Sequence, residues 1–189
     1  MGIKRIIETA KKMGINSPLD DTPSLALGSS DVNLLEMTCA YSTIANNGKH
    51  HDPVLVTKIV DHDGKVVYKG PTDSEQVIPY KSAFLMQQLL QGGMKEPGGT
   101  SQSLWGYVGN YRDTEFGGKT GTTNNHSDAW FMCVSPKLVV GAWVGGEYIG
   151  KAVADLSQII IQCMRDTRLA PAAKDHAAHL SAKELGMFT

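Results

Sequence analysis

The sequence has no long hydrophobic run, no recognisable leader and no excess of charge of either sign. None of its apolar stretches reaches the roughly 20 residues that a membrane-spanning helix needs. Residues 1–5 begin an amphipathic pattern directly, with no apolar segment of the kind that precedes a signal cleavage site. The 18 Lys and Arg residues nearly balance the 19 Asp and Glu residues, which gives a net charge of −1. We therefore expect no signal, anchor or membrane contact in this chain, and no nucleic-acid partner.

Cysteine is scarce, and no set of residues has the spacing of metal ligands. The three cysteines, Cys39, Cys133 and Cys163, lie far apart, and an odd number cannot complete a set of internal disulfides. We expect them to be small buried hydrophobic residues. The six histidines, His50 among them, fall in loops or polar stretches where we expect no clear partner. We predict that the chain binds no metal.

Apolar residues recur at helical spacing in four places, within a composition that is 41% apolar and 20% charged and so typical of a globular protein. The predicted helices run from Ile3 to near Gly14, from an N-cap at Ser30 or Asp31 to Asn47-Gly48, over 82–91 and over 153–168. We expect the glycines at 92, 93, 98 and 99 to end the third helix and open a loop. The polar, Ala-rich residues 170–189 are compatible with one more weak helix or with a frayed end.

Two regions have β character. Residues 54–60 and 66–68 flank Asp63-Gly64, which is a hairpin signal. A calcium loop around Asp61 and Asp63 is an alternative, but the glycine comes too early and the later ligands are missing. From 116 to 145 a polar Gly-rich strand is followed by strands over 129–134 and 138–144, and these short connections predict an antiparallel meander. We expect Trp130 and Trp143 to pack in its core.

The segment Gly117–Asn125 carries the chemistry. Its Gly-Lys-Thr tripeptide allows a nucleotide-binding loop, but that loop needs a glycine at position 113, which is Asp113. The loop must also open into a helix, and residues 121–125 are poor helix formers. The phosphate-binding interpretation therefore fails at two independent points.

A second interpretation fits the residue types better. Lys119-Thr120-Gly121 is one of three signature elements of the serine acyl-transferases that react with β-lactams, beside Ser-x-x-Lys and a Ser-x-Asn type element. A β-strand offers backbone hydrogen bonds to a substrate strand, and Gly121 permits close approach. Thr120 and Thr122 alternate along that strand, so their hydroxyls point to one side and can bind a carboxylate. Strict alternation places Lys119 on the other side, so a twist must turn it into the cleft.

The flanking residues resemble a known family. Lys119–Asn125, Asp128–Phe131 and Val140–Gly145 are similar to the transpeptidase domain of class A, bifunctional penicillin-binding proteins, as are blocks at 23–30, 35–48, 53–64 and 99–100. The blocks keep the family's order from about 10 to 146. The resemblance implies an α/β (α+β) fold of the β-lactamase/DD-transpeptidase type, with an antiparallel sheet flanked by helices. Residues 1–169 would be the incomplete, C-terminal part of that domain.

The resemblance also implies an activity, acyl transfer on the D-Ala-D-Ala stem peptides of peptidoglycan. Lys119 and Thr122 would be catalytic, with the backbone N–H of Thr122 as an oxyanion donor, and Thr120, Gly121, Thr122 and Thr123 would bind substrate. The implied partners are the stem peptide, β-lactams and a missing N-terminal half of the domain. The family uses no cofactor or metal and works at the extracytoplasmic face of the cytoplasmic membrane.

These 189 residues contain neither Ser-x-x-Lys nor Ser-x-Asn. Because both elements precede this segment in the family, we expect the chain to be a fragment that is inactive alone. Two alternatives stay open: a non-catalytic module that binds peptidoglycan or a partner protein through the same cleft, and a β-lactamase or β-lactam sensor with the same fold.

Overall fold

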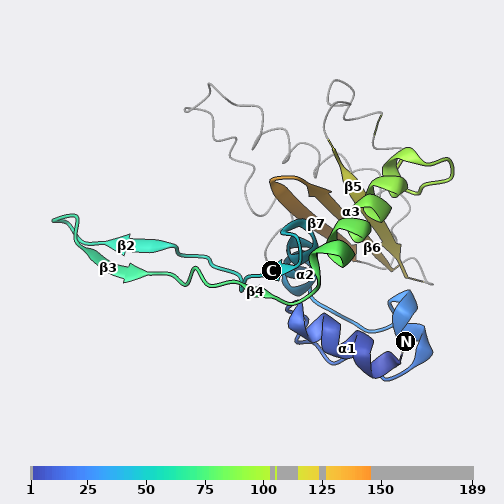
Figure 1. Cartoon of the computed structure of the whole chain (residues 1–189), viewed down its shortest axis with the longest axis horizontal. Helices are drawn as coiled ribbons and strands as arrows, with labels where there is room; N and C mark the ends of the chain where they lie inside the picture. The colour runs from blue at the N-terminus through green and yellow to red at the C-terminus, as the bar shows by residue number, and fades with distance from the viewer. Residues whose placement is uncertain (1, 103–104, 106–114, 124–126, 146–189) are drawn as a thin grey trace. The chain divides into compact units, whose positions relative to one another are not determined.

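The structure is a computed structural model, and it describes residues 2–102, 105, 115–123 and 127–145 (Figure 1). The chain divides into two compact units, Met1–Ala83 and Phe84–Thr189. The first holds two α-helices, a 3-10 helix and four short strands, and the second holds most of a long helix and a three-stranded sheet. The helix predicted over 153–168 and the tail at 170–189 lie outside the described residues.

The N-terminal helix forms as predicted. α1 spans Ile3–Lys12, with two lysines in its last turn, where positive charge is favoured. Gly14 follows with a φ of +96°, a conformation that ends helices and suits glycine. A 3-10 helix, η1, then covers Pro23–Leu27 within the stretch expected to be turns.

The helix α2, Leu34–Ala45, begins later than predicted. Its N-cap is Asn33, whose side-chain oxygen accepts a hydrogen bond from the Glu36 amide at 2.9 Å. The predicted caps, Ser30 and Asp31, precede it. The Ser30 hydroxyl instead accepts the amide N–H of Asp20 at 3.0 Å. The predicted N-cap was wrong because Ser30, Asp31 and Asn33 are all residue types that can cap a helix, and Ser30 is bound to the loop at Asp20 instead.

The end of α2 lies where the sequence predicts it, since Asn47 and Gly48 both adopt positive φ angles. A Cβ atom on Gly48 would lie 2.2 Å from the backbone oxygen of Ile78, so only glycine fits this turn. The chain then forms β1, Lys49–His50, which pairs antiparallel with β4, Glu75–Gln76.

His50 has two polar neighbours, so the prediction that it lacks a clear partner was wrong. Its Nδ1 atom is 3.0 Å from the Thr43 hydroxyl, and its Nε2 atom is 3.4 Å from a carboxylate oxygen of Asp52. Thr43 is buried and also donates to the carbonyl of Cys39. The two-residue strand β1 packs against α2, and this contact, which leaves no periodic signal in the sequence, brings the ring to Thr43.

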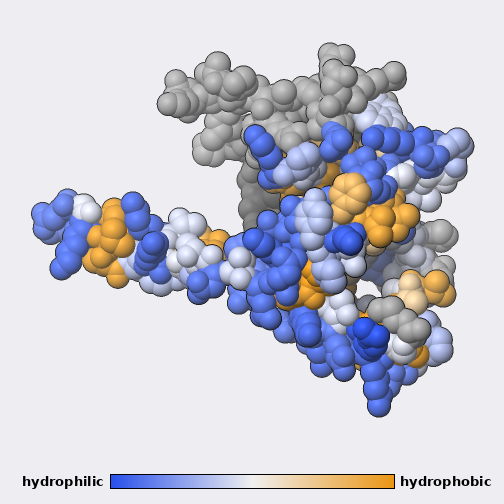
Figure 2. All heavy atoms as spheres, in the orientation of Figure 1, coloured by the Kyte–Doolittle hydropathy of each residue, from blue (hydrophilic) through white to orange (hydrophobic). Residues whose placement is uncertain are grey.

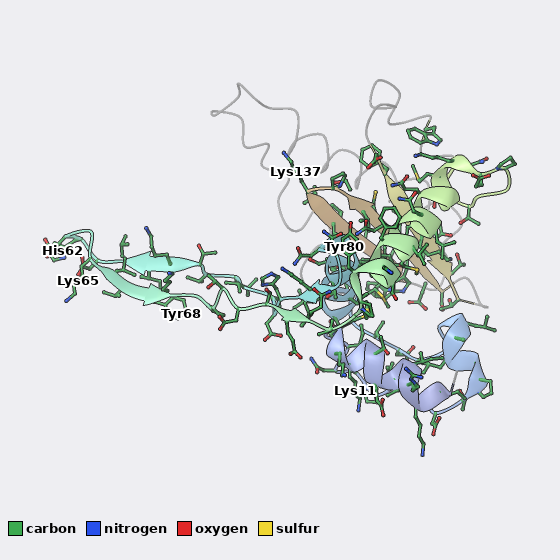
Figure 3. All side chains as sticks on the ribbon, in the orientation of Figure 1. Lys11, His62, Lys65, Tyr68, Tyr80 and Lys137 are labelled. Carbon is green, nitrogen blue, oxygen red and sulfur yellow. The ribbon has the colours of Figure 1, made fainter. Side chains whose placement is uncertain are left out.

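The predicted hairpin forms from β2, Lys58–Val60, and β3, Val66–Lys69. The first strand begins at Lys58 and not at Val54, so it is shorter than predicted. Every residue of both strands is exposed, and apolar side chains are visible along the surface of the hairpin in Figure 2. Figure 3 shows His62 and Lys65 at the tip and Tyr68 on β3. No metal-ligand cluster of three or more side chains occurs among the described residues.

The helix α3 spans Tyr80–Lys95 and runs through both glycines that we expected to end it. A Cβ atom on Gly93 would lie 2.8 Å from the backbone oxygen of Gly118, whereas one on Gly92 would meet only a side-chain carbon at 3.6 Å. Gly93 is therefore a packing residue and not a helix breaker. In the part of the chain that the structure describes, no helix is long and apolar enough to span a membrane.

The meander predicted at 116–145 is confirmed. β5 (Gly117–Thr122), β6 (Asp128–Ser135) and β7 (Leu138–Gly145) form an antiparallel sheet in that order, with an unbroken register. One cluster of buried residues forms its core, namely Met94, Phe116, Ala129, Phe131, Cys133 and Ala142. Burial raises the pKa of the Cys133 thiol to about 12, so this cysteine is a core residue, as predicted. Cys39 is only half-buried, and Cys163 lies outside the described residues.

Candidate active site

The Lys-Thr-Gly motif lies in β5, the first strand of the sheet. Lys119 and Thr122 are exposed, Thr120 and Gly121 are half-buried, and the two preceding glycines are buried. One side of β5 pairs with β6, and among the described residues no strand pairs with its other side. An exposed strand edge presents backbone N–H and C=O groups to which an extended peptide can bind. The strand geometry also confirms that the segment is not a nucleotide-binding loop.

Glycines at the start of β5 let other elements pack directly on its backbone. A Cβ atom on Gly117 would lie 2.9 Å from Cβ of Leu90 in α3, and one on Gly118 would lie 2.9 Å from the ring of Phe131. Contacts this short do not occur for real side chains, so larger residues here would displace the strand. The helix and the neighbouring strand therefore fix the position of the motif.

Lys119 and Thr120 are held by hydrogen bonds on and near the strand. The Lys119 ammonium group donates to the carbonyl oxygen of Thr120 at 2.5 Å, so the side chain folds back along its own strand. The Thr120 hydroxyl donates to the hydroxyl of Thr100 at 2.9 Å. The structure thus places Lys119, Thr120, Gly121 and Thr122 together on one strand. Gly121 lies opposite Trp130, and a Cβ atom on it would come within 3.1 Å of the Trp130 Cβ.

Thr123 closes the turn between β5 and β6. Its backbone N–H donates to the carbonyl of Asp128 at 3.2 Å, and its hydroxyl accepts the Asp128 N–H at 3.0 Å. The hydroxyl of Ser127 lies 3.1 Å from that of Thr123 and donates to the Asp128 carboxylate at 3.0 Å. These bonds engage the Thr123 hydroxyl in the turn, whereas its predicted role is substrate binding.

Asp128 links the turn to β7, because the indole N–H of Trp143 donates to its carboxylate at 2.9 Å. This hydrogen bond, with a smaller contribution from Ser127, holds the pKa of the Asp128 carboxyl below its usual range. Trp143 is 44% exposed, so the prediction that it packs in the core was wrong. Its ring centroid lies 6.4 Å from that of the half-buried Trp130. The polar edge of the indole group explains its position beside a carboxylate.

Hydrophobic periodicity does not place Thr100 and Ser101 at this strand. Both lie in the turn after α3. The Ser101 backbone N–H donates to the carbonyl of Gly93 at 3.1 Å. The side chain of Ser101 is buried, and its hydroxyl has no hydrogen-bond partner among the described residues. A separation of 20 residues between Thr100 and Thr120 carries no periodic signal, so only the pairing of the turn with α3 reveals their contact.

Comparisons with known proteins match most of the chain to one family. The family model described as the penicillin binding protein transpeptidase domain matches residues 8–140. Penicillin-binding protein 2D of Bacillus subtilis is 34% identical over 146 residues, which are 77% of this chain and 21% of that protein. The chain spans about a fifth of the length of the curated relatives it matches.

Solved structures of such proteins share the fold. Penicillin-Binding Protein 1A from Haemophilus influenzae superposes with a TM-score of 0.66 at 26% identity, covering 76% of this chain and 26% of that one. The PonA1 protein from Mycobacterium tuberculosis, solved in complex with penicillin V, has a TM-score of 0.57 at 24% identity, covering 74% and 40%. The predicted fold class, an antiparallel sheet with helices, is confirmed.

Proposed function

Because the chain belongs to the penicillin-binding protein transpeptidase family, we propose that it supplies the substrate-binding strand of a DD-transpeptidase that cross-links peptidoglycan. The proposal rests on β5, which carries Lys119, Thr120 and Thr122 and has one edge that no strand of the described residues pairs with. The penicillin V complex of a protein with the same fold supports a β-lactam as a second ligand. Peptidoglycan lies outside the cytoplasmic membrane, so the site would work on that side.

The chemistry follows from the groups on the strand. A stem peptide ending in D-Ala-D-Ala would pair with the open edge of β5 through backbone hydrogen bonds. The hydroxyl of Thr122 would bind the terminal carboxylate, with Thr120 on the same side of the strand. The ammonium group of Lys119 would favour the negative charge of the substrate. The backbone N–H of Thr122 would serve as one oxyanion donor, a type of contact whose loss typically costs about 3 kcal/mol of transition-state stabilisation.

The acylating nucleophile must come from outside these 189 residues. No serine of the chain is followed three residues later by lysine, and that spacing places the general base on the serine's own helical face. Ser127 is the serine nearest the motif, but Trp130 stands three residues later, and its hydroxyl donates to Asp128. The chain alone should therefore bind substrate without reacting with it.

A non-catalytic module is a second candidate, favoured by the absence of Ser-x-x-Lys in the 189 residues. Such a module would use the same strand to bind peptidoglycan, without acyl transfer. The test compares the chain alone with the chain mixed with the Ser-x-x-Lys half of the domain, expressed separately from a relative. A transpeptidase forms a covalent adduct with penicillin only in the mixture. A non-catalytic module binds penicillin in both samples and forms no covalent adduct. Intact-mass spectrometry distinguishes the two functions.

Binding by the chain itself is tested by titrating the ¹⁵N-labelled protein with N-acetyl-D-alanyl-D-alanine and with its C-terminal amide. We expect the acid to shift the amide signals of β5 and to bind more tightly than the amide. Lys119→Ala should weaken acid binding about tenfold, because the strand loses its charge complement. Lys11→Ala, an exposed lysine of α1 (Figure 3), is the matched control. Equal binding of acid and amide by the wild-type chain would rule out the proposed function.

A further inference from the structure

The hydroxyl of Thr120 is already used within the protein. It donates to Thr100 Oγ1 at 2.9 Å, and a hydroxyl has only one proton to donate. A carboxylate accepts hydrogen bonds and donates none. Of these two hydroxyls, therefore, only that of Thr100 still has a proton to donate to a carboxylate.

The position of Thr100 is built into the packing of three backbone segments. Gly93 lets α3 approach the carbonyl of Gly118 in β5, because a Cβ atom there would lie 2.8 Å from that oxygen. Gly99 lets the following turn fold back on α3, since its Cβ atom would lie 2.4 Å from the carbonyl oxygen of Gly93. The Gly99 N–H donates to the carbonyl of Glu96 at 2.9 Å, which holds the turn. Thr100 therefore reaches β5 because glycines remove the side chains between the layers.

A buried polar group marks the same turn. Ser101 is 1% exposed, and its Oγ has no hydrogen-bond partner in the described part of the chain. This atom lies 3.4 Å from where a Cβ of Gly118 would be, on the face of β5 that Thr120 and Thr122 share by alternation. An unpaired buried hydroxyl is costly and is found where a water, ion or function completes it. The turn thus brings two hydroxyls to the face of β5 that carries Thr120 and Thr122.

We propose that Thr100 is a further substrate-binding residue, which accepts a hydrogen bond from Thr120 and donates its own hydroxyl to the terminal carboxylate of the substrate. Thr120 is then a positioning residue that acts through Thr100. Donation by Thr120 polarises the Thr100 hydroxyl and strengthens the bond that it makes. The inference rests on the proposed function, and it adds a residue from outside the Lys-Thr-Gly strand to the recognition of the carboxylate.

The test uses the 189-residue chain with N-acetyl-D-alanyl-D-alanine and its C-terminal amide as probes. Thr100→Val removes the donor and should weaken binding of the acid about tenfold, whereas binding of the amide should change less than twofold. Thr100→Ser keeps the hydroxyl and should stay within twofold of wild type. Thr22→Val, an exposed threonine before η1, is the control.

A double-mutant cycle separates the roles of the two threonines. If Thr120 acts through Thr100, Thr100→Val combined with Thr120→Val should weaken acid binding no further than Thr100→Val alone. Two outcomes would overturn the inference and leave the proposed function standing, provided that the wild type still prefers the acid. One is a double variant whose loss of affinity equals the product of the two single losses. The other is a Thr100→Val variant whose affinity for the acid stays within twofold of wild type. A wild-type chain that does not distinguish acid from amide would overturn both.

Discussion

Two β-hairpins in this protein have similar sequence signals and different surroundings. β6 and β7 pair over eight residues each in an unbroken register, from Asp128 opposite Gly145 to Ser135 opposite Leu138. β2 and β3 pair over three positions, and their register shifts between Ile59 and Val60. Most of β6 is buried, whereas every residue of β2 and β3 is exposed. Turn chemistry and β-branched residues therefore specify pairing, and a third strand or helix decides burial.

The largest difference between the hairpins should be in stability. Phe131 on β6 is 4% exposed and packs on Gly118, so Phe131→Ala should destabilise its unit by about 3–5 kcal/mol. Tyr68 on β3 is 45% exposed, and Tyr68→Ala should cost below about 1 kcal/mol. Urea unfolding followed by far-UV circular dichroism measures both. Similar losses for the two variants would mean that an unseen contact covers the β2–β3 hairpin.

Two adjacent glycines of α3 test how tightly the helix packs on the buried sheet. Gly93→Ala forces a Cβ atom to within 2.8 Å of the Gly118 carbonyl oxygen and should destabilise the protein by about 1–3 kcal/mol. Gly92→Ala meets only a side-chain carbon at 3.6 Å and should stabilise α3 by about 0.5–1 kcal/mol, since alanine favours helix. The same urea experiment applies. Opposite signs for neighbouring positions would separate tertiary packing from helix propensity, and equal signs would contradict the α3–β5 contact.

Local chemistry explains what the sequence predicted correctly. Asp63-Gly64 between β-branched runs predicts a hairpin, and Gly48 after an apolar helical stripe predicts the end of α2. The three strands of the meander follow from alternating runs joined by short turns. The strand position of Lys119 follows because residues 121–125 cannot continue as a helix. Each of these signals acts within a few residues and needs no knowledge of what packs against it.

Tertiary contacts explain what the sequence did not predict. Gly93 breaks helices in isolation, yet α3 continues through it because β5 needs that space. Thr100 reaches Thr120 through a turn that folds back on α3, and His50 reaches Thr43 through a two-residue strand. Trp143 is exposed because its indole N–H binds Asp128. All of these pairings join residues from different elements, and hydrophobic periodicity does not encode them.

The smallest expected effect lies in the exposed hairpin, where Lys58 stands directly opposite Lys69. Like charges at opposed positions destabilise a strand pair, and opposite charges stabilise one by about 0.2–1 kcal/mol. Lys58→Glu should therefore slow amide hydrogen exchange at Ile59 and Tyr68 by up to about fivefold, and 1 M salt should remove the gain. Lys69→Glu should act in the same direction, and the double variant, which restores two like charges, should return to the wild-type exchange rate. Protection that rises in all three variants would show that lysine itself, and not its opposed charge, weakens the hairpin, and the register of β2 on β3 would then need to be revised.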